Sequence, residues 1–339
     1  MLSDNSPMNL VKKTLMPEWS PQRCMWVGWP SSSVLWGPDL QLARWETSQL
    51  VAALNKCVHV RLITSGSEAD KSAKFMCGPR CDVIDLPMGD IWIRDTGPVY
   101  ATNDEKLIGL TFGFNGWGEK FILEGDQDIA EAMLAVDGIS SLSHEIILEG
   151  GALDFDGHGT LLTTRQCMLN SNRNRDWAED RAEDFLINAF GAKQIIWLDQ
   201  GILGDHTDGH VDNLARFIGD GRVVCQRPSG TNDPNAAVFA STQKTLENAG
   251  LDIVTIPSPG LITDSTGAVM PASHLNFVIA NGSIIMPIYE EIYSDMARCQ
   301  LQEVMPEFEV IGLPANGLLT GGGAFHCMTQ QVPSPELNR

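Results

Sequence analysis

Cationic side chains are scarce in this sequence of 339 residues, which has 23 lysines and arginines against 43 aspartates and glutamates. The formal net charge of −20 disfavours nucleic acid and membranes as partners, because both polyanions would be repelled. The charge is compatible with a small cationic substrate, although an acidic surface more often serves solubility alone. Hydrophobic residues make up 43% of the chain, which is enough for a substantial core, so intrinsic disorder is not expected.

A long uninterrupted apolar stretch is also absent. The first residues lack the apolar run of a secretory signal, and the longest charge-free segment, residues 265–289, contains two prolines and an Asn-Gly turn. A helix of that composition could not keep its backbone hydrogen-bonded in lipid, so two strands around a hairpin are predicted there. We therefore expect a cytoplasmic protein with eight reduced cysteines. The isolated Cys77-x-x-x-Cys81 spacing is a weak zinc signal.

Three common signatures are missing. The sequence has no GxSxG nucleophile elbow, no GxxxxGK[ST] phosphate loop and no GxGxxG at the start of a helix. Residues 321–323 are three glycines, but no Lys-Ser or Lys-Thr pair follows them, so a phosphate cradle is not predicted there.

Helical periodicity is found in five segments, with short β-rich runs between them. The predicted helices span residues 39–56, 126–136, 176–190, 234–249 and 289–304. The fourth has Asp233 as its predicted N-cap, Pro234 in its first turn and Gly250 just past its end. Hairpins are predicted at Asn103-Asp104, Asp156-Gly157, Asp220-Gly221 and Asn281-Gly282.

The turn dipeptides recur at intervals of about 50–65 residues. This spacing indicates a unit with a hairpin, a helix and a further strand that is repeated about five times, although no residue-by-residue repeat accompanies it. One unit cannot bury both faces of its sheet, whereas a ring of units can. No linker or low-complexity tract divides the chain, so a single α/β domain over residues 1–339 is predicted.

Polar residues crowd beside glycine in four segments, 89–98, 148–151, 205–212 and 321–327. Loops of this composition commonly carry binding groups. Cys327 follows three glycines and a histidine, a setting in which the backbone can approach a ligand closely and a neighbouring cation would favour the thiolate. Cys327 is therefore a candidate nucleophile with His210 as a distant acid/base partner, and a buried structural cysteine is the alternative.

His206 and His210 are four residues apart, with three aspartates among and beside them. On a helix the two histidines could chelate zinc. Gly209 and the preceding apolar run favour a loop that continues into a strand. In an extended His210-Val211-Asp212, the imidazole and the carboxylate would project from the same face. A base beside a carboxylate is the favoured interpretation, and a metal site is the alternative.

Further acidic residues stand beside aromatic residues and glycines. Asp90 and Asp95 flank Trp92 and Arg94, and Glu149 precedes two glycines. Taken singly, each has a structural explanation, because a carboxylate can cap a turn and an arginine can form a surface ion pair. Their joint occurrence with a candidate cysteine and histidine is not explained in this way.

These segments together resemble the agmatine deiminase branch of the guanidine-modifying superfamily, alongside bacterial peptidyl-arginine deiminase-like proteins. The similarity runs nearly end to end. It includes, in order, MPEWSPQ and GWP, WIRDTGP, FGFNGWGEK, EGG, GTLLTT, CMLNSNRN, TDGHVDNLARF, SHLNFVIANG and GGGAFHCMTQQVP. The resemblance implies a five-bladed α/β propeller (pentein) of ββαβ-type units around a central active site, in agreement with the repeat spacing.

The resemblance also implies roles for five residues. Cys327 would be the nucleophile and His210 the general acid/base. Asp95 and Asp212 would grip the guanidinium, and Glu149 would be oriented toward the histidine. Such an enzyme would need neither a metal nor an organic cofactor.

The resemblance and its motifs also suggest contacts to the rest of the substrate. Trp92 would form an aromatic wall along the aliphatic stem, and Trp117 is a second candidate for the same pocket. Asp90, Asp208 and His206 are the polar candidates. The expected partner is a small cationic guanidine, and assembly into a homodimer is left open.

The expected chemistry follows from the electrophile. A guanidinium is planar and resonance-stabilised, so its carbon is a poor electrophile. Two carboxylates can take its N–H groups and hold the carbon in line with a sulfur. Attack by Cys327 and loss of ammonia would give a covalent amidino-thioether, which water would then hydrolyse with His210 as base. With agmatine, the products would be N-carbamoylputrescine and ammonia.

The sequence departs from the family pattern at three places. His206 stands where many relatives have an acidic residue, and Ala152 and Ala324 stand where asparagine is frequent. These departures keep other guanidines, arginine-like ones included, as alternative substrates. Transfer of the amidino group to an amine, a metal-dependent hydrolase that uses His206 and His210, and a binding protein without turnover are further alternatives.

Overall fold

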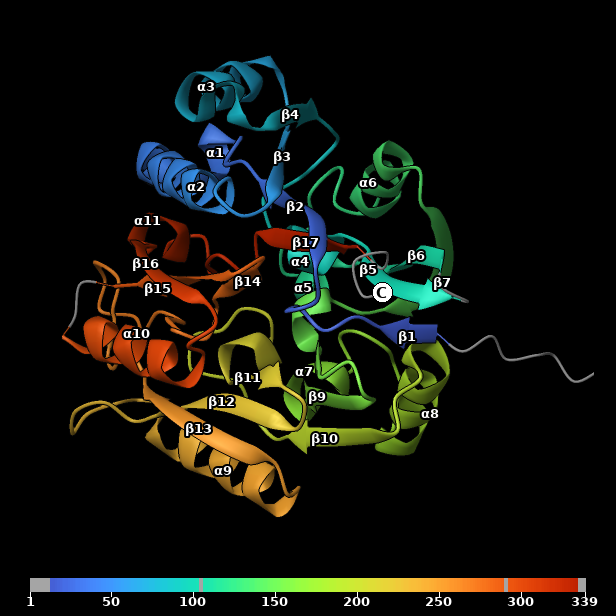
Figure 1. Cartoon of the computed structure of the whole chain (residues 1–339), viewed down its shortest axis with the longest axis vertical. Helices are drawn as coiled ribbons and strands as arrows, with labels where there is room; N and C mark the ends of the chain where they lie inside the picture. The colour runs from blue at the N-terminus through green and yellow to red at the C-terminus, as the bar shows by residue number, and fades with distance from the viewer. Residues whose placement is uncertain (1–12, 104–105, 290–291, 335–339) are drawn as a thin grey trace, which may run out of the picture.

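The computed structural model describes residues 13–103, 106–289 and 292–334 (Figure 1). Within these residues the strands form five separate sheets. In the order of strands across each, they are β17 (Thr329–Pro333), β2 (Gln22–Gly28), β3 (His59–Thr64) and β4 (Asp82–Asp85); β1 (Lys13–Leu15), β5 (Val99–Asn103), β6 (Lys106–Gly113) and β7 (Ser140–Ile147); β8 (Asp154–Phe155), β9 (Thr160–Thr164) and β10 (Gln194–Leu198); β11 (Ala215–Gly219), β12 (Arg222–Arg227) and β13 (Asp252–Pro257); and β14 (Val278–Ala280), β15 (Ser283–Ile288) and β16 (Glu309–Pro314).

All five sheets share one plan, which confirms the predicted repeat of a hairpin, a helix and a further strand. An antiparallel pair is followed by a helix and then by a strand that runs parallel to the second member of the pair. The crossover helices are α2 (Leu40–Leu54), α6 (Ile129–Asp137), α8 (Glu179–Phe190), α9 (Ala236–Asn248) and α10 (Tyr293–Val304). They correspond to the five predicted helices. In the last of these, predicted over residues 289–304, residues 290 and 291 lie outside the described residues.

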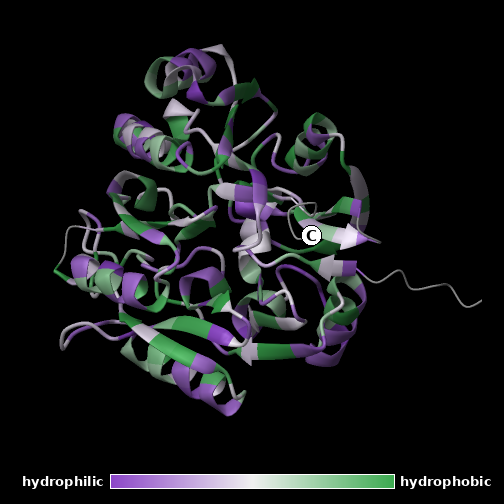
Figure 2. Cartoon of the chain, viewed as in Figure 1, coloured by the Kyte–Doolittle hydropathy of each residue, from purple (hydrophilic) through white to green (hydrophobic). Residues whose placement is uncertain are grey.

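One sheet joins the two ends of the described chain. Its antiparallel pair combines β17 with β2, so that Thr329 is opposite Val27 (Figure 1). In Figure 1 the five sheets lie around the middle of the molecule and the crossover helices lie toward its outside. Figure 2 shows apolar residues concentrated on the strands and mixed polar and apolar residues on the helices, as expected for helices that bury one face.

The predicted hairpins are present. Pairing of Phe155 with Leu161, of Gly219 with Arg222 and of Ala280 with Ser283 closes three of them, and pairing of Asn103 with Lys106 closes the fourth. Asp104 of that fourth turn lies outside the described residues. Gly221 and Gly282 have φ values of 61° and 76°, a conformation that glycine adopts without strain.

Two local predictions differ from the structure. The start of α9 is displaced, because Pro234 and Asn235 form a turn before the helix, and Asn235 instead of Asp233 is the N-cap. Asp233 accepts the backbone N–H groups of Ser229 and Asn235 and so fixes this turn. Helix α3 (Ser67–Cys77), which leads from β3 to β4, was not predicted, and its buried residues are two alanines, Ala69 and Ala73.

The eight cysteines are free thiols, as expected. Cys77 and Cys81 belong to no group of three or more metal-binding side chains within the described residues. None of the helices in the described part of the chain combines the length and the apolar character needed to span a bilayer.

Asp137 at the end of α6 connects two of the sheets. Its carboxylate has no exposed surface and accepts hydrogen bonds from Trp26 Nε1 and Tyr100 OH, both at 3.0 Å. It also pairs with the guanidinium groups of Arg23, at 3.0 Å, and Arg61. Because β2 and β3 belong to one sheet and β5 to another, one carboxylate holds two repeats together.

We expect Asp137→Ala to lower the free energy of unfolding by about 2 kcal/mol or more, because it leaves two buried donors without an acceptor at about 1–3 kcal/mol each. Denaturant unfolding followed by circular dichroism measures this change. Asp70→Ala is the control, because its helical i,i+4 pair with the half-exposed Lys74 is worth only about 0.5 kcal/mol. Equal losses in the two variants would contradict the assigned role of Asp137.

Candidate active site

The candidate catalytic residues come from segments with one common place in the repeat, just before the first strand of an antiparallel pair. Asp95 lies on the helical turn α4 (Ile93–Thr96) before β5, and Glu149 precedes the turn η3 (Gly150–Ala152) and β8. His210 precedes the turn η4 (Val211–Asn213) and β11, while Cys327 lies two residues before β17. Equivalent positions of separate repeats therefore bring residues that are distant in sequence to one place.

The prediction of an extended His210-Val211-Asp212 segment is wrong. His210 itself is extended, with φ −63° and ψ 141°, but Val211 begins a 3₁₀ turn because the segment ends against the following strand β11. The two side chains therefore do not alternate along a strand. Instead, His210 faces Asp95 while Asp212 faces Cys327.

Cys327 is buried, with 6% of its surface exposed. Its Sγ is 3.7 Å from Asp212 Oδ2. Burial, together with the negative charges of Asp212 and Asp95, raises the pKa of the Cys327 thiol well above its usual value. The sulfur is therefore a protonated thiol at neutral pH.

The two carboxylates are held in different ways. Asp95 accepts hydrogen bonds from Trp117 Nε1 and from the backbone N–H of Gly151, both at 2.9 Å. Asp212 Oδ2 is 2.8 Å from His326 Nδ1, whereas Asp212 Oδ1 is buried and has no hydrogen-bond partner. A buried carboxylate oxygen without a partner is costly, and an N–H donor from a ligand would satisfy it.

The ring of His210 lies between two acids and is fully buried. Its Nδ1 is 3.6 Å from Asp95 Oδ1, and its Nε2 is 3.8 Å from Glu149 Oε2. Neither nitrogen has a hydrogen-bond partner. Burial alone would lower the pKa of His210, but the charge of Asp95 and the groups of Cys167 and Glu149 raise it well above its usual value. The ring is thus a proton donor at neutral pH.

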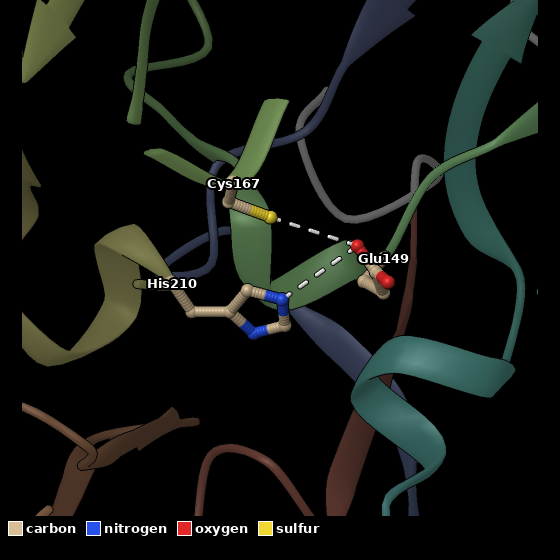
Figure 3. A group of neighbouring side chains, drawn as sticks. All are labelled: Glu149, Cys167 and His210. Atoms are coloured by element: carbon tan, nitrogen blue, oxygen red, sulfur yellow. Dashed lines mark hydrogen bonds and ion pairs between the residues drawn. The ribbon is translucent and has the colours of Figure 1, made fainter. Parts of the chain in front are cut away.

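Glu149 links His210 to a second buried cysteine. Figure 3 shows its carboxylate between the ring of His210 and the thiol of Cys167, whose Sγ is 3.7 Å from Glu149 Oε2. The other oxygen, Glu149 Oε1, is 2.6 Å from Nε of the buried Arg173. Against the effect of burial, His210 and Arg173 hold the pKa of Glu149 below its usual value, so this acid is ionised.

Glu149, Cys167 and His210 are also the one group of potential metal ligands found in the described part of the chain, with ligand atoms within 4.8 Å of one another. His206 does not belong to this group. The metal site that uses both His206 and His210, considered above as an alternative, is therefore not found among the described residues. Arg173 already supplies a positive charge to Glu149, which weakens the attraction of this group for a metal cation.

A cavity of about 370 Å³ leads to Cys327 and Asp95. Its aromatic lining includes Trp36 and Trp92, whose ring centroids are 6.0 Å apart, as well as Trp117 and Phe121. Its acidic side chains are Asp39, Asp90 and Asp95, and no lysine or arginine within the described residues lines it. His210, Asp212 and Glu149 do not line the cavity. His210 contacts Asp95 and Asp212 contacts Cys327, and both of these partners line it.

Four of the five candidate substrate contacts, Trp92, Trp117, Asp90 and His206, line this cavity. Asp90 also accepts a hydrogen bond from Trp36 Nε1 at 3.0 Å. Asp208 does not line the cavity, so its role as a substrate contact stays a prediction. Its oxygens are 2.7 Å from Lys120 Nζ and 2.6 Å from Arg173 Nη1, so it holds the His206–His210 loop in place.

Sequence reasoning missed the residues that support this site. They lie in segments that were recognised only as motifs, and they are Glu18 in MPEW, Cys167 and Arg173 in CMLNSNRN, Asn276 in SHLNF, and His326 before the nucleophile. Arg94 is likewise buried, where it contacts the carbonyl of His326 and Gln331 Oε1, and does not form the surface ion pair considered above. Polar residues inside recurring motifs were the available signal.

Residues 14–333 match the sequence profile of the Porphyromonas-type peptidyl-arginine deiminase family, and the chain belongs to this family. A Shewanella baltica protein provisionally named as an agmatine deiminase is 34% identical over 94% of this chain and 93% of its own length. The structure of a cysteine-to-serine variant of C. jejuni agmatine deiminase with substrate bound is also similar, with a TM-score of 0.89, 28% identity and coverage of 95% of this chain and 97% of that one. The agmatine deiminase of Enterococcus faecalis gives a TM-score of 0.90 at 25% identity, over 95% of this chain and 96% of that chain.

The raised pKa of Cys327 predicts how this thiol reacts in the absence of substrate. Its rate of alkylation by iodoacetamide should rise about tenfold per pH unit below that pKa, because only the thiolate reacts. Asp212→Asn removes the nearest negative charge and should raise the rate at a fixed pH by about tenfold. Peptide mass spectrometry resolves Cys327 from the exposed Cys299, whose rate should be unchanged. An equal rate at Cys327 in both proteins would contradict this electrostatic account.

Proposed function

We propose that this protein is a cysteine-dependent hydrolase of agmatine. The observation that carries the proposal is the meeting of a thiol, two carboxylates and a histidine from three repeats at the end of an aromatic, acidic cavity. A guanidinium between Asp95 and Asp212 would satisfy the partnerless Asp212 Oδ1 and neutralise both acids. The substrate would thereby remove the effect of the two charges that, together with burial, raise the pKa of Cys327.

The proposed reaction has two stages. As the guanidinium binds, Cys327 loses its proton to solvent, and its sulfur forms a bond to the guanidinium carbon. The C–N bond to one terminal nitrogen then breaks, and His210 gives its proton to the departing ammonia. In the second stage His210 takes a proton from water, the hydroxide attacks the amidino carbon, and the C–S bond breaks. The remaining hydroxyl proton passes to the departing sulfur, so the products are a urea and ammonia, and the thiol of Cys327 is regenerated.

Cavity charge favours agmatine over arginine. The cavity has three aspartates and no lysine or arginine among its described lining residues, so an α-carboxylate would be buried beside negative charge without an arginine or lysine partner. Agmatine has an amine in its place, and N-carbamoylputrescine would be the product. The similarity to the agmatine deiminases of C. jejuni and Enterococcus faecalis supports this choice.

The same reasoning extends to the architecture. We propose that the five sheets are the blades of a single α/β propeller domain whose axis passes through the site. The common plan of the sheets supports this proposal, as do the contributions of their equivalent segments to one site. In such a ring, pairing of β17 with β2 would join the last repeat to the first.

We expect Cys327→Ala to lower the rate of ammonia release from agmatine by about 10⁴-fold or more, because the nucleophile is lost. Chelator should leave the wild-type rate unchanged. Intact-protein mass spectrometry with a panel of guanidines should detect an amidino adduct that depends on Cys327. Loss of activity with chelator and its recovery with zinc would overturn the proposal. Faster turnover of arginine than of agmatine would overturn only the assignment of agmatine as the substrate.

The need for glycine at position 151 gives a second test. A Cβ there would lie 2.6 Å from His210 Nδ1 and 2.8 Å from Asp95 Oδ1, so Gly151→Ala must displace both side chains. We expect ammonia release to fall by about 100-fold, since displacements of about 1 Å have effects of this size. Gly219→Ala is the control, because its Cβ would meet only Arg222 at 3.7 Å. Full activity in Gly151→Ala would contradict the proposed arrangement.

A further inference from the structure

Asn276 lies against the sulfur of Cys327. Its Nδ2 is 3.1 Å from Cys327 Sγ, and among the described residues no other side chain donates a hydrogen bond to this atom. The amide is buried, with 1% of the residue exposed, and Nδ2 is also 3.1 Å from Asn213 Oδ1. Each of the two amide hydrogens of Asn276 therefore has an acceptor.

The orientation of this amide follows from its partners. Asn276 Oδ1 accepts the backbone N–H groups of His326, at 3.0 Å, and of Cys327, at 3.3 Å. Backbone N–H groups can only donate, so the amide oxygen must face them, and the NH₂ group must then face the sulfur. The same side chain thus fixes both the backbone that carries the nucleophile and the nucleophile itself.

Asn276 also occupies a place in the repeat that four other units use for their candidate catalytic residues. It lies two residues before β14, as Cys327 lies two residues before β17. The segments before β5, β8 and β11 contribute Asp95, Glu149 and His210. The unit with β14 would otherwise contribute nothing to the site.

We propose that Asn276 is a catalytic residue whose Nδ2–H group donates a hydrogen bond to the sulfur of Cys327, aims it at the substrate carbon and stabilises the thiolate. The inference rests on the proposed role of Cys327 as nucleophile. No atom is transferred, because the amide N–H bond stays intact throughout. The hydrogen bond strengthens when the sulfur becomes an anion, as hydrogen bonds to charged acceptors do.

The neighbouring charges explain why an amide suits this position. Asp212 and Asp95 favour the protonated thiol, and Asn276 acts in the opposite sense. A lysine or arginine at this position would also favour the thiolate, but it would pair with Asp212 and compete with the guanidinium for that carboxylate. A neutral donor stabilises the sulfur anion and leaves the negative charge of the acids for the substrate.

The test is the pH dependence of Cys327 alkylation by iodoacetamide in the full chain, which needs no substrate. We expect Asn276→Ala to lower the rate at a fixed pH by about 10- to 100-fold, the range for a hydrogen bond to a charged group. Asn276→Asp should lower it further, since one carboxylate oxygen can still accept the two backbone N–H groups while the other repels the thiolate. With agmatine, kcat should fall while KM changes little, because Asn276 does not line the cavity.

Asn281→Asp is the matched control. Asn281 also accepts a backbone N–H, from Gln22 at 2.9 Å, and donates to the carbonyl of Gln22 at 2.8 Å, but it lies in the turn after β14. Its pH profile should equal that of the wild type. Circular dichroism verifies folding, and if Asn276→Asp does not fold, Asn276→Ala decides.

A folded Asn276 variant that has the same alkylation profile and the same kcat as the wild type would overturn the inference. If the wild-type protein does not hydrolyse agmatine but alkylation slows in the variants, the proposed function fails while the hydrogen bond to the sulfur is retained. The two proposals therefore fail independently.

Discussion

The hydrogen bond between His326 and Asp212 is the interaction on which the rest of the site depends. It is the last link of a buried chain of polar contacts that begins at Asp154. Arg216 connects Asp154, at 2.6 Å, with Glu18. Glu18 Oε2 is 3.3 Å from His326 Nε2, and His326 Nδ1 is 2.8 Å from Asp212. This chain fixes which oxygen of Asp212 is occupied and which one is left for a ligand.

Such a network is poorly explained by stability alone. Removing charges from water costs several kcal/mol per ion, and apolar residues of similar volume often stabilise a fold as well or better. Opposing the effect of burial, Arg216 and His326 lower the pKa of Glu18 to about 2, so this acid stays ionised over the whole physiological range. Fixed orientation of Asp212 is a physical gain that an apolar core could not supply. This role explains why the MPEW motif contains an acidic residue, Glu18.

The repeat explains how one site can draw on so much of the sequence. Each unit ends its connection to the next with a short polar segment that enters an antiparallel pair, and these segments differ in chemistry while they share position. The five places hold, in turn, an acid, an acid with two glycines, a histidine with an acid, an amide and a thiol. Conserving the backbone plan while varying one position per unit is enough to build an asymmetric site from similar parts.

The sequence allowed the repeated elements to be predicted because their signals are local. Turn dipeptides such as Asp220-Gly221 and amphipathic helices such as α8 depend on neighbouring residues alone. The predictions for the start of α9 and for the segment after His210 were wrong because contacts outside the local sequence pattern decided both. The carboxylate of Asp233 fixes the first, and the entry into β11 fixes the second.

The site divides in the same way. Motifs suggested Cys327, His210 and three acids as candidates. Arg173 and Cys167 contact Glu149 only across the fold, and periodicity carries no trace of such contacts. The ion pairs of Asp208 could not be predicted for the same reason, because its partners, Lys120 and Arg173, come from other segments.

The pairing of β17 with β2 has a consequence for the newly made polypeptide. The candidate nucleophile is carried into position by the last described strand, which must find a partner formed about 300 residues earlier. A chain still emerging from the ribosome can complete its first repeats, yet it holds no thiol opposite the acids. The candidate site is therefore complete only after the segment that carries Cys327 has been synthesised and β17 has paired with β2.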